Sequence, residues 1–200
     1  MTKVLHIISS PRGRESFSIK LGEAIVTKIC SKYPDTKVEE FNLTTQTFPH
    51  LEEIHLASFF TPADNRSAEQ ALAVKHSDHA ISQIQDADII VIGAPLYNFG
   101  IHSTLKAWID HIVRAGITFS YGENGVEGLV KNKKAYIALA SGGVYSEGPA
   151  KEMDFVAPYL KSILGFIGIT DISVFRVEGT AMVANPEIPL RETIDSIIID

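Results

Sequence analysis

The most informative segment for the fold is Ala87-Asp88-Ile89-Ile90-Val91-Ile92-Gly93-Ala94-Pro95-Leu96-Tyr97-Asn98-Phe99-Gly100. Its first half is a continuous apolar run rich in β-branched residues, which is typical of a central parallel strand buried on both faces. Gly93, Ala94 and Pro95 are expected to end this strand, because proline has no N–H to donate to the ladder. Two aromatic rings and an amide follow directly, at the carboxyl end of a core strand. Ligands of open α/β sheets bind at that edge, and these side chains suit a flat aromatic ligand.

The composition limits the kind of protein and its partners. The chain has 200 residues, 45% of them hydrophobic, which predicts one domain over residues 1–200. A formal net charge of −6 provides no basic surface, so neither nucleic acid nor an anionic membrane is expected as a partner. No apolar run is long enough for a signal peptide or a membrane span, and a single cysteine, Cys30, allows no internal disulfide. These features predict a cytoplasmic protein that needs no metal.

Strand-like and helix-like patterns alternate along the chain. Strands are predicted at residues 4–8, 37–43, 89–93, 135–140 and 172–177. Helical patterns follow them at about residues 16–32, 67–85, 103–112, within 149–168, and at 189–199. Such β-α units favour an α/β fold, a doubly wound five-stranded parallel sheet of order 2-1-3-4-5 with helices on both faces. Residues 44–66 and 115–132 have no clear period and are interpreted as long insertions, which are usually functional.

The loop after the first strand contains groups that bind a phosphate. Its sequence is Ser9-Ser10-Pro11-Arg12-Gly13-Arg14-Glu15-Ser16-Phe17-Ser18. It offers hydroxyls, two guanidinium groups and the free backbone N–H groups at the start of a helix. An equally good interpretation is that Ser16 or Ser18 only caps the helix. The loop matches neither Gly-x-Gly-x-x-Gly nor Gly-x-x-x-x-Gly-Lys-Ser/Thr, so a Rossmann-type dinucleotide site and P-loop phosphoryl transfer are not expected.

Two more loops are predicted at the same edge of the sheet. The stretch from Pro95 to Gly100 presents its aromatic rings there, although these rings would equally well fill the core. Gly142 and Gly143 follow the fourth strand, where glycine lets the backbone approach a ligand and present N–H groups to it; the alternative is an ordinary turn. Three such loops together indicate a ligand with a phosphate at one end and a flat heteroaromatic ring at the other.

Several motifs, in order along nearly the whole chain, resemble one known family. They are Lys3-Val4-Leu5 running to Ser9-Ser10, Ser16-x-Ser18-x-x-Leu21, Ala94-Pro95-Leu96-Tyr97-Asn98-Phe99, Leu105-Lys106-Ala107-Trp108-Ile109-Asp110, Arg114-Ala115-Gly116-Ile117-Thr118-Phe119, Tyr121-x-Glu123-Asn124-Gly125, Gly142-Gly143, and Tyr159-Leu160 with Leu164-Gly165-Phe166-Ile167-Gly168. On these motifs the chain resembles the FMN-dependent NADH-azoreductase and quinone reductase family of flavodoxin-like flavoproteins. It departs from the family pattern at Ile19, where members often have Asn, and at Ala140, where they often have Ser or Thr.

The resemblance implies a flavodoxin-like domain that binds FMN. The phosphate would be held by Ser10, Ser16, Phe17 and Ser18. The isoalloxazine ring would lie beside Pro95, Leu96, Tyr97, Asn98 and Phe99. The polar edge of the ring would face the turn formed by Ala140, Ser141, Gly142 and Gly143.

The resemblance also implies an enzyme, an FMN-dependent NADH:quinone oxidoreductase and NADH-azoreductase. Hydride would pass from NADH or NADPH through FMN to a quinone or an aromatic azo compound, in a ping-pong, two-electron mechanism. Tyr145 is a possible proton donor, and a plain wall residue is the alternative. A homodimer is implied, whose substrate pocket would be walled by Phe60, Phe119 and Tyr121. Two other functions stay open, a flavodoxin-type electron carrier and a non-catalytic flavin-binding module.

Overall fold

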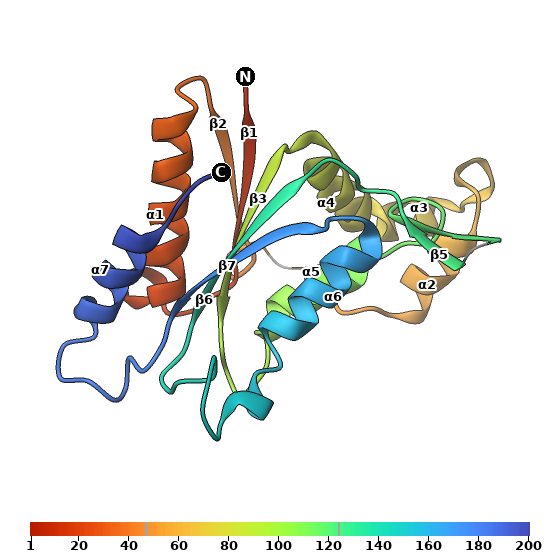
Figure 1. The fold of residues 1–200 in the computed structure, drawn as a ribbon. Helices are drawn as coiled ribbons and strands as arrows, with labels where there is room; N and C mark the ends of the chain where they lie inside the picture. Colours follow the sequence, from red (N-terminus) through yellow and green to blue (C-terminus); the bar gives the residue numbers. More distant parts are fainter. Residues whose placement is uncertain (47, 124) are drawn as a thin grey trace.

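A five-stranded parallel sheet is the centre of the computed structural model, which describes residues 1–46, 48–123 and 125–200 (Figure 1). The strands lie in the order β2-β1-β3-β6-β7, which is 2-1-3-4-5 when only these five are counted. They are β1 (Lys3–Ile8), β2 (Lys37–Asn42), β3 (Ile89–Pro95), β6 (Lys134–Ala140) and β7 (Asp171–Val177). The predicted fold class and strand order are therefore confirmed.

β3 is the middle strand, and all seven of its residues are buried. It extends to Pro95, which lies opposite Ala140 of β6, whereas the sequence pattern predicted an end at Gly93. A proline at the last position of a strand removes no necessary ladder bond when the next residue donates instead. Leu96 N–H does so, to Ala140 O at 2.8 Å. The strand therefore delivers its loop directly beside the end of β6.

Helices cover both faces of the sheet, as predicted (Figure 1). α1 (Phe17–Lys32) and α7 (Glu187–Ser196) lie together on one face. α4 (Lys75–Asp86), α5 (Ser103–Ile112) and α6 (Ala157–Ile167) lie on the other. Alternate strand residues point to opposite faces, so Leu5 joins one apolar core and Val4 joins the other. This double layer leaves the carboxyl edge of the sheet to the connecting loops.

Both long insertions contain regular structure that the sequence pattern did not predict. Residues 44–66 include α2 (Glu53–Phe60) and a 3-10 turn (Ala63–Asn65), and residues 115–132 form an antiparallel hairpin of β4 (Phe119–Gly122) and β5 (Gly125–Gly128). The pattern misses α2 because its buried positions are His55 and Ser58, while its Leu56 and Phe60 are exposed. Thr47 and Asn124, one in each insertion, lie outside the described residues.

The single helix predicted at residues 67–85 is in fact two helices. They are α3 (Ala68–Ala73) and α4, and they meet at Val74. α3 begins with a capping box, in which Ser67 Oγ accepts from Gln70 N–H at 3.2 Å and Gln70 Oε1 accepts from Ser67 N–H at 3.0 Å. α3 has no buried residue, whereas α4 buries one face against the core, so only α4 contributes to the sheet layer.

Two further features of the described residues concern membranes and metals. No helix in this part of the chain has both the length and the apolar character needed to cross a bilayer. His, Cys, Asp and Glu side chains in the same part nowhere gather in threes, as a metal site would require. The rings of His76 and His79, which lie three residues apart, instead pack edge to face against Phe48 and Phe41.

One histidine, His6, is buried between β1 and α1. His6 is 2% exposed, and its Nε2 has no hydrogen-bond partner within the described residues. On α1, a Cβ atom at Gly22 would lie only 2.6 Å from this Nε2, so glycine provides the room that the imidazole occupies. Burial lowers the pKa of His6 to about 4, because a charged imidazolium would lose its solvation there.

We expect His6 to make the protein sensitive to acid. The folded pKa of about 4 lies below the ordinary value of 6.5, so folding favours the neutral ring and this contribution is complete above pH 6.5. It is lost as the pH falls towards 4, by about 2 kcal/mol at pH 5. Urea unfolding at pH 7 and at pH 5 measures the loss. The difference between the two free energies of unfolding should shrink by that amount in His6→Leu, and an unchanged difference would contradict the assignment.

Candidate functional site

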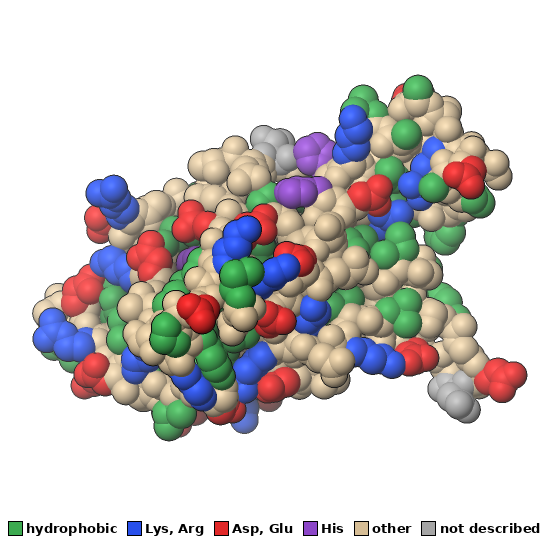
Figure 2. All heavy atoms as spheres, turned by 90° about the horizontal axis from the view of Figure 1, so that it is seen from above, with side chains coloured by type: hydrophobic (Ala, Val, Ile, Leu, Met, Phe, Trp, Pro, Cys, Tyr) green, Lys and Arg blue, Asp and Glu red, His purple; other side chains and the backbone are tan. Residues whose placement is uncertain are grey.

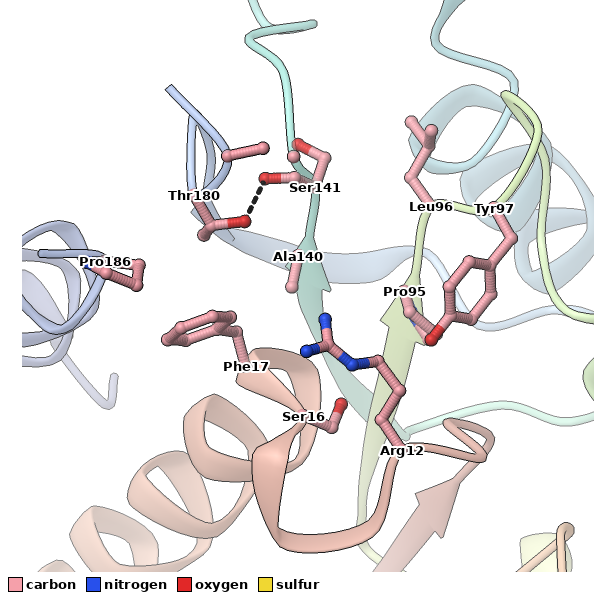
Figure 3. A pocket seen from close by; sticks show the side chains of 12 residues that line it. Arg12, Ser16, Phe17, Pro95, Leu96, Tyr97, Ala140, Ser141, Thr180 and Pro186 are labelled. Carbon is pink, nitrogen blue, oxygen red and sulfur yellow. Dashed lines mark hydrogen bonds between the residues drawn. The ribbon is translucent and has the colours of Figure 1, made fainter. Parts of the chain in front are cut away.

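A cleft opens at the carboxyl edge of the sheet, beyond the ends of β1, β3, β6 and β7 (Figure 3). Its volume is about 360 Å³, within the range of about 300–1,000 Å³ that is typical of small-molecule sites. Four loops contribute the lining residues, which are Arg12, Ser16, Phe17, Pro95, Leu96, Tyr97, Ala140, Ser141, Gly142, Thr180, Ala181 and Pro186. Each loop follows a different strand, so the parallel direction of the sheet brings them together.

The β1 end of the cleft is suited to an anion. α1 begins at Phe17, and the first amides of a helix have no acceptor within the helix. Ser16 occupies the capping position, but its side chain makes no capping hydrogen bond. Its Oγ lies 3.0 Å from Oγ of Ser18, which is buried directly behind it. The positive end of the helix dipole is therefore open to an external anion such as a phosphate.

Arg12 adds a positive charge at the same end. Its side chain extends over the cleft beside Ser16, with the guanidinium group pointing toward Ala140 (Figure 3). The chain turns at Gly13, whose φ of +55° is a conformation that glycine adopts without strain. Ser10 is buried below this turn, and its Oγ accepts from Arg12 N–H at 3.4 Å. The loop between β1 and α1 thus combines charge, hydroxyls and helix amides around one position.

The turn after β3 brings aromatic rings and an amide to the rim of the cleft. Tyr97 and Gly100 exchange two backbone hydrogen bonds, of 3.0 and 2.9 Å, around Asn98 and Phe99. The φ values are +48° for Asn98 and +68° for Phe99, which makes this a type I′ turn. Asparagine tolerates positive φ, whereas phenylalanine is strained there by about 1–2 kcal/mol. Strained backbone of this kind concentrates at ligand sites.

The turn after β6 is held by its carbonyl groups. Ser141 O accepts from Thr180 Oγ1 at 3.1 Å, and the carbonyls of Gly142 and Gly143 accept from amides of the loop after β7 (Figure 3). Ser141 Oγ donates to Gly143 O at 2.8 Å. Among the described residues, the N–H groups of Gly142 and Gly143 have no protein acceptor. Two uncommitted amides beside a cleft suit the electron-rich edge of a heteroaromatic ring.

The loop after β7 forms one wall of the cleft, although no sequence motif indicated its residues as part of the site. Thr180, Ala181 and Pro186 line the cleft across from Tyr97 (Figure 3). The end of this loop is joined to α1 by an ion pair, with 2.6 Å between Lys20 Nζ and a carboxylate oxygen of α7. A signal was available in the sequence, because the sheet is parallel and the carboxyl end of its last strand, β7, must also lie at this edge.

Eight of the thirteen predicted cofactor residues line the cleft, and the other five lie next to it. Ser10 and Ser18 are buried behind it, and Asn98 and Phe99 are exposed at its rim. The fifth residue, Gly143, lines a neighbouring hollow together with Tyr145, the predicted proton donor.

The three residues predicted to wall a substrate pocket do not line this cleft. Phe60 at the end of α2 is 79% exposed, and Tyr121 in β4 is 76% exposed. Phe119 is buried, with its ring centroid 4.6 Å from that of Phe166. Within one chain, these three side chains therefore lie outside the cleft.

Comparison with known proteins agrees with this geometry. Residues 2–197 match the model of a family described as having a flavodoxin-like fold. A protein from Herminiimonas arsenicoxydans named FMN-dependent NADH:quinone oxidoreductase is 50% identical over 182 residues, which cover 91% of this chain and 89% of that protein. The chain belongs to this flavodoxin-like family. A protein of the same name from Agrobacterium fabrum is 46% identical over 181 residues, or 90% of this chain and 88% of that protein.

Solved structures of the family agree with the fold over nearly its full length. An azoreductase from Bacillus anthracis gives a TM-score of 0.89 at 33% identity, with 98% of both chains covered. An FMN-dependent NADH-azoreductase from the same species, solved in complex with FMN, gives a TM-score of 0.87 at 27% identity, with 98% of this chain and 97% of that chain covered. The family resemblance predicted from the sequence motifs is confirmed.

We expect stability and ligand binding to oppose each other at Phe99. Phe99→Gly removes the strain of a positive φ and should raise the free energy of unfolding by about 1 kcal/mol. The same change removes an aromatic ring from the rim and should weaken binding of a flat aromatic ligand. Urea unfolding measures the first effect, and fluorescence titration with FMN as a probe measures the second.

Asn132→Gly is the matched control for this prediction. Asn132 also has a positive φ, of +60°, and is not among the lining residues of the cleft. Its replacement should affect stability alone. A Phe99→Gly protein that binds FMN as tightly as the unmodified protein would contradict a ligand role for this turn.

Proposed function

We propose that this chain is an FMN-dependent NADH:quinone oxidoreductase that also reduces aromatic azo compounds, with NADH or NADPH as the electron donor. One observation carries the proposal, namely that a single cleft has two unlike ends. The open start of α1 with Arg12 lies at one end, and the Tyr97 turn with the free amides of Gly142 and Gly143 lies at the other. FMN has the matching parts, a phosphate and a flat heteroaromatic ring. The names of the relatives support the same assignment.

The residues present fit FMN. The first amides of α1, the Ser16 hydroxyl and the Arg12 guanidinium group would hold the phosphate. Leu96 and Tyr97 would lie along the ring. The free amides of the β6 turn would stabilise negative charge on its polar edge. When bound, FMN supplies the two-electron chemistry, since it takes hydride from a reduced nicotinamide and passes it to the acceptor.

We infer a ping-pong order for the two substrates. The Tyr97 turn lies on one side of the cleft and Thr180 and Pro186 lie on the other, so both substrates would have to reach a bound ring through the same opening. They would therefore use it in turn, with the oxidised nicotinamide leaving before the quinone or azo compound binds. Tyr145 is the candidate proton donor, because its hydroxyl lies beside the β6 turn. A Cβ atom added at Gly143 would be 3.3 Å from this hydroxyl. With NADH or NADPH as the donor, we propose that the reaction takes place in the cytoplasm.

A homodimer is part of the proposal. α2 with α3 and the β4–β5 hairpin form two projections, at the right of Figures 1 and 2, and hydrophobic side chains gather where the projections face each other. The large exposed apolar residues of these elements, with Leu129 directly after β5, are between 39% and 79% exposed: Leu56, Phe60, Leu72, Tyr121, Val126 and Leu129. Exposed apolar surface of this kind is typical of an interface. A second copy would cover it and place Phe60 and Tyr121, supported by Phe119, at the substrate pocket.

The experiment is anaerobic mixing of the FMN-loaded protein with NADH. The yellow absorbance of the flavin should disappear rapidly and return when a quinone or an azo dye is added. Flavin that stays yellow in NADH would indicate a flavodoxin-type electron carrier. A protein that takes up no FMN at all would contradict both the enzyme and the flavin-binding module.

A pair of variants of α1 tests the site behind this activity. Ser16→Ala combined with Ser18→Ala removes two hydroxyls at the anion end and should raise the Kd for FMN roughly tenfold, since a hydrogen bond to a charged group is worth about 1.5–3 kcal/mol. Ser31→Ala removes a hydroxyl from the exposed end of the same helix, where it donates only to Thr27 O, and should leave the Kd unchanged. Equal effects of the two changes would contradict the placement of the phosphate.

A further inference from the structure

Three charged side chains, Asp154, Arg176 and Glu178, form a partly buried ion triad beside the cleft. Arg176 Nη2 donates to Asp154 Oδ2 at 2.6 Å, and Arg176 Nη1 lies 3.5 Å from Glu178 Oε1. The side chains are 22% exposed for Arg176, 6% for Asp154 and 11% for Glu178. One guanidinium group therefore joins two carboxylates that are themselves largely shielded from solvent.

The triad connects the end of β7 to the start of α6. Asp154 precedes α6, and its Oδ1 accepts from Val156 N–H at 3.0 Å and from Ala157 N–H at 3.1 Å. Burial acts to raise the pKa of Asp154, but the hydrogen bonds from Arg176 and from these amides outweigh it and hold the pKa below its ordinary value. The carboxylate is thus charged at neutral pH and bridges a strand to a helix.

Tyr145 extends the triad to the β6 turn. Glu178 Oε1 accepts from Tyr145 N–H at 2.9 Å. The ring of Tyr145 covers Gly143, where an added Cβ atom would lie 3.1 Å from it. The same ring meets Phe99 edge to face, with 6.2 Å between the centroids. Tyr145 therefore lies between the two turns that border the cleft.

Phe155 provides a second connection, to the β3 turn. It follows Asp154 in the chain, and its N–H donates to Phe99 O at 3.2 Å. Phe99 has the strained positive φ of the type I′ turn, so this turn depends on its surroundings to keep its conformation. Both turns are thus attached to the same three charged side chains.

We propose that Arg176 is a positioning residue, which sets the separation of the β3 and β6 turns and so shapes the ring-binding end of the cleft. That this end binds the ring of FMN rests on the function proposed above. Stability alone does not account for the triad, because apolar residues of similar volume often stabilise a core as well as a buried ion pair does. A positioning role does account for the triad, since its three side chains attach α6, the β6 turn and, through Phe155, the β3 turn to one another.

The test removes the bridge while keeping the local hydrogen bonds. In Asp154→Asn with Arg176→Met, the amide oxygen at position 154 still accepts from the start of α6, but nothing joins it to β7. The Kd for FMN and the KM for the quinone should each rise roughly tenfold, as expected for a coupled network near a site, with a smaller change in kcat. The visible circular dichroism of bound FMN should also change shape. Arg176→Lys keeps the charge but spans the two carboxylates poorly, and should be intermediate.

Hydrogen exchange tests the same proposal without any activity. In the full chain before FMN is added, the amides of Tyr145 and Phe155 should exchange faster in the double variant by roughly tenfold or more. Lys134→Met is the matched control, because Lys134 also bridges two carboxylates but lies at the start of β6, at the end of the sheet away from the cleft. Its Nζ is 3.3 Å from Asp171 Oδ2 and 2.9 Å from Asp200 Oδ2. It should lower stability without selective exchange at those two amides.

Two results would overturn the positioning role. One is wild-type exchange at Tyr145 and Phe155 in the double variant, and the other is an equal effect of Lys134→Met on these amides and on the KM. A protein that shows no NADH:quinone activity before any substitution would instead reject the proposed function, and the exchange measurement would still decide the role of Arg176.

Discussion

Backbone pairing between β3 and β6 is the interaction on which the rest of the structure depends. It joins seven residue pairs, from Ile89 opposite Lys134 to Pro95 opposite Ala140, and Leu96 N–H extends it by one more bond. The strands are buried on both faces, so a slip of one residue would exchange the side chains of the two apolar cores. Because the strands are parallel, the same register places the two loops that follow them side by side at one edge. The site is therefore a consequence of the register of the sheet.

The candidate site departs from rules that the rest of the chain obeys. The start of α1 has no side-chain cap, two amides of the β6 turn have no acceptor among the described residues, and Phe99 has a strained φ. The strain at Phe99 destabilises the free protein, and the two apolar cores that cover the sheet offset the loss. All three departures lie at one cleft, which is the distribution expected when a ligand supplies the missing interactions.

The sequence predicts the sheet and most of the cleft because buried strands and amphipathic helices leave direct patterns, and because parallel strands must end together. It does not predict α2, whose apolar side chains are exposed. It does not predict that His102 caps α5, with Nδ1 accepting from Thr104 N–H, since histidine is an unusual residue at that position. The φ of Phe99 is set by the turn and not by the residue type. Phe60 and Tyr121 were predicted to wall a pocket, but within one chain both side chains are exposed and do not line the cleft.

Calorimetric titration of the purified protein with FMN and, separately, with riboflavin tests the flavin site, because riboflavin has the same ring system but no phosphate. Helix amides, hydroxyls and a guanidinium group around one phosphate should together be worth about 3 kcal/mol or more, so FMN should bind at least roughly a hundredfold more tightly than riboflavin. Equal affinities for the two compounds, or no heat of binding with either, would contradict the central claim that the loops at the carboxyl edge of the sheet form a flavin mononucleotide site.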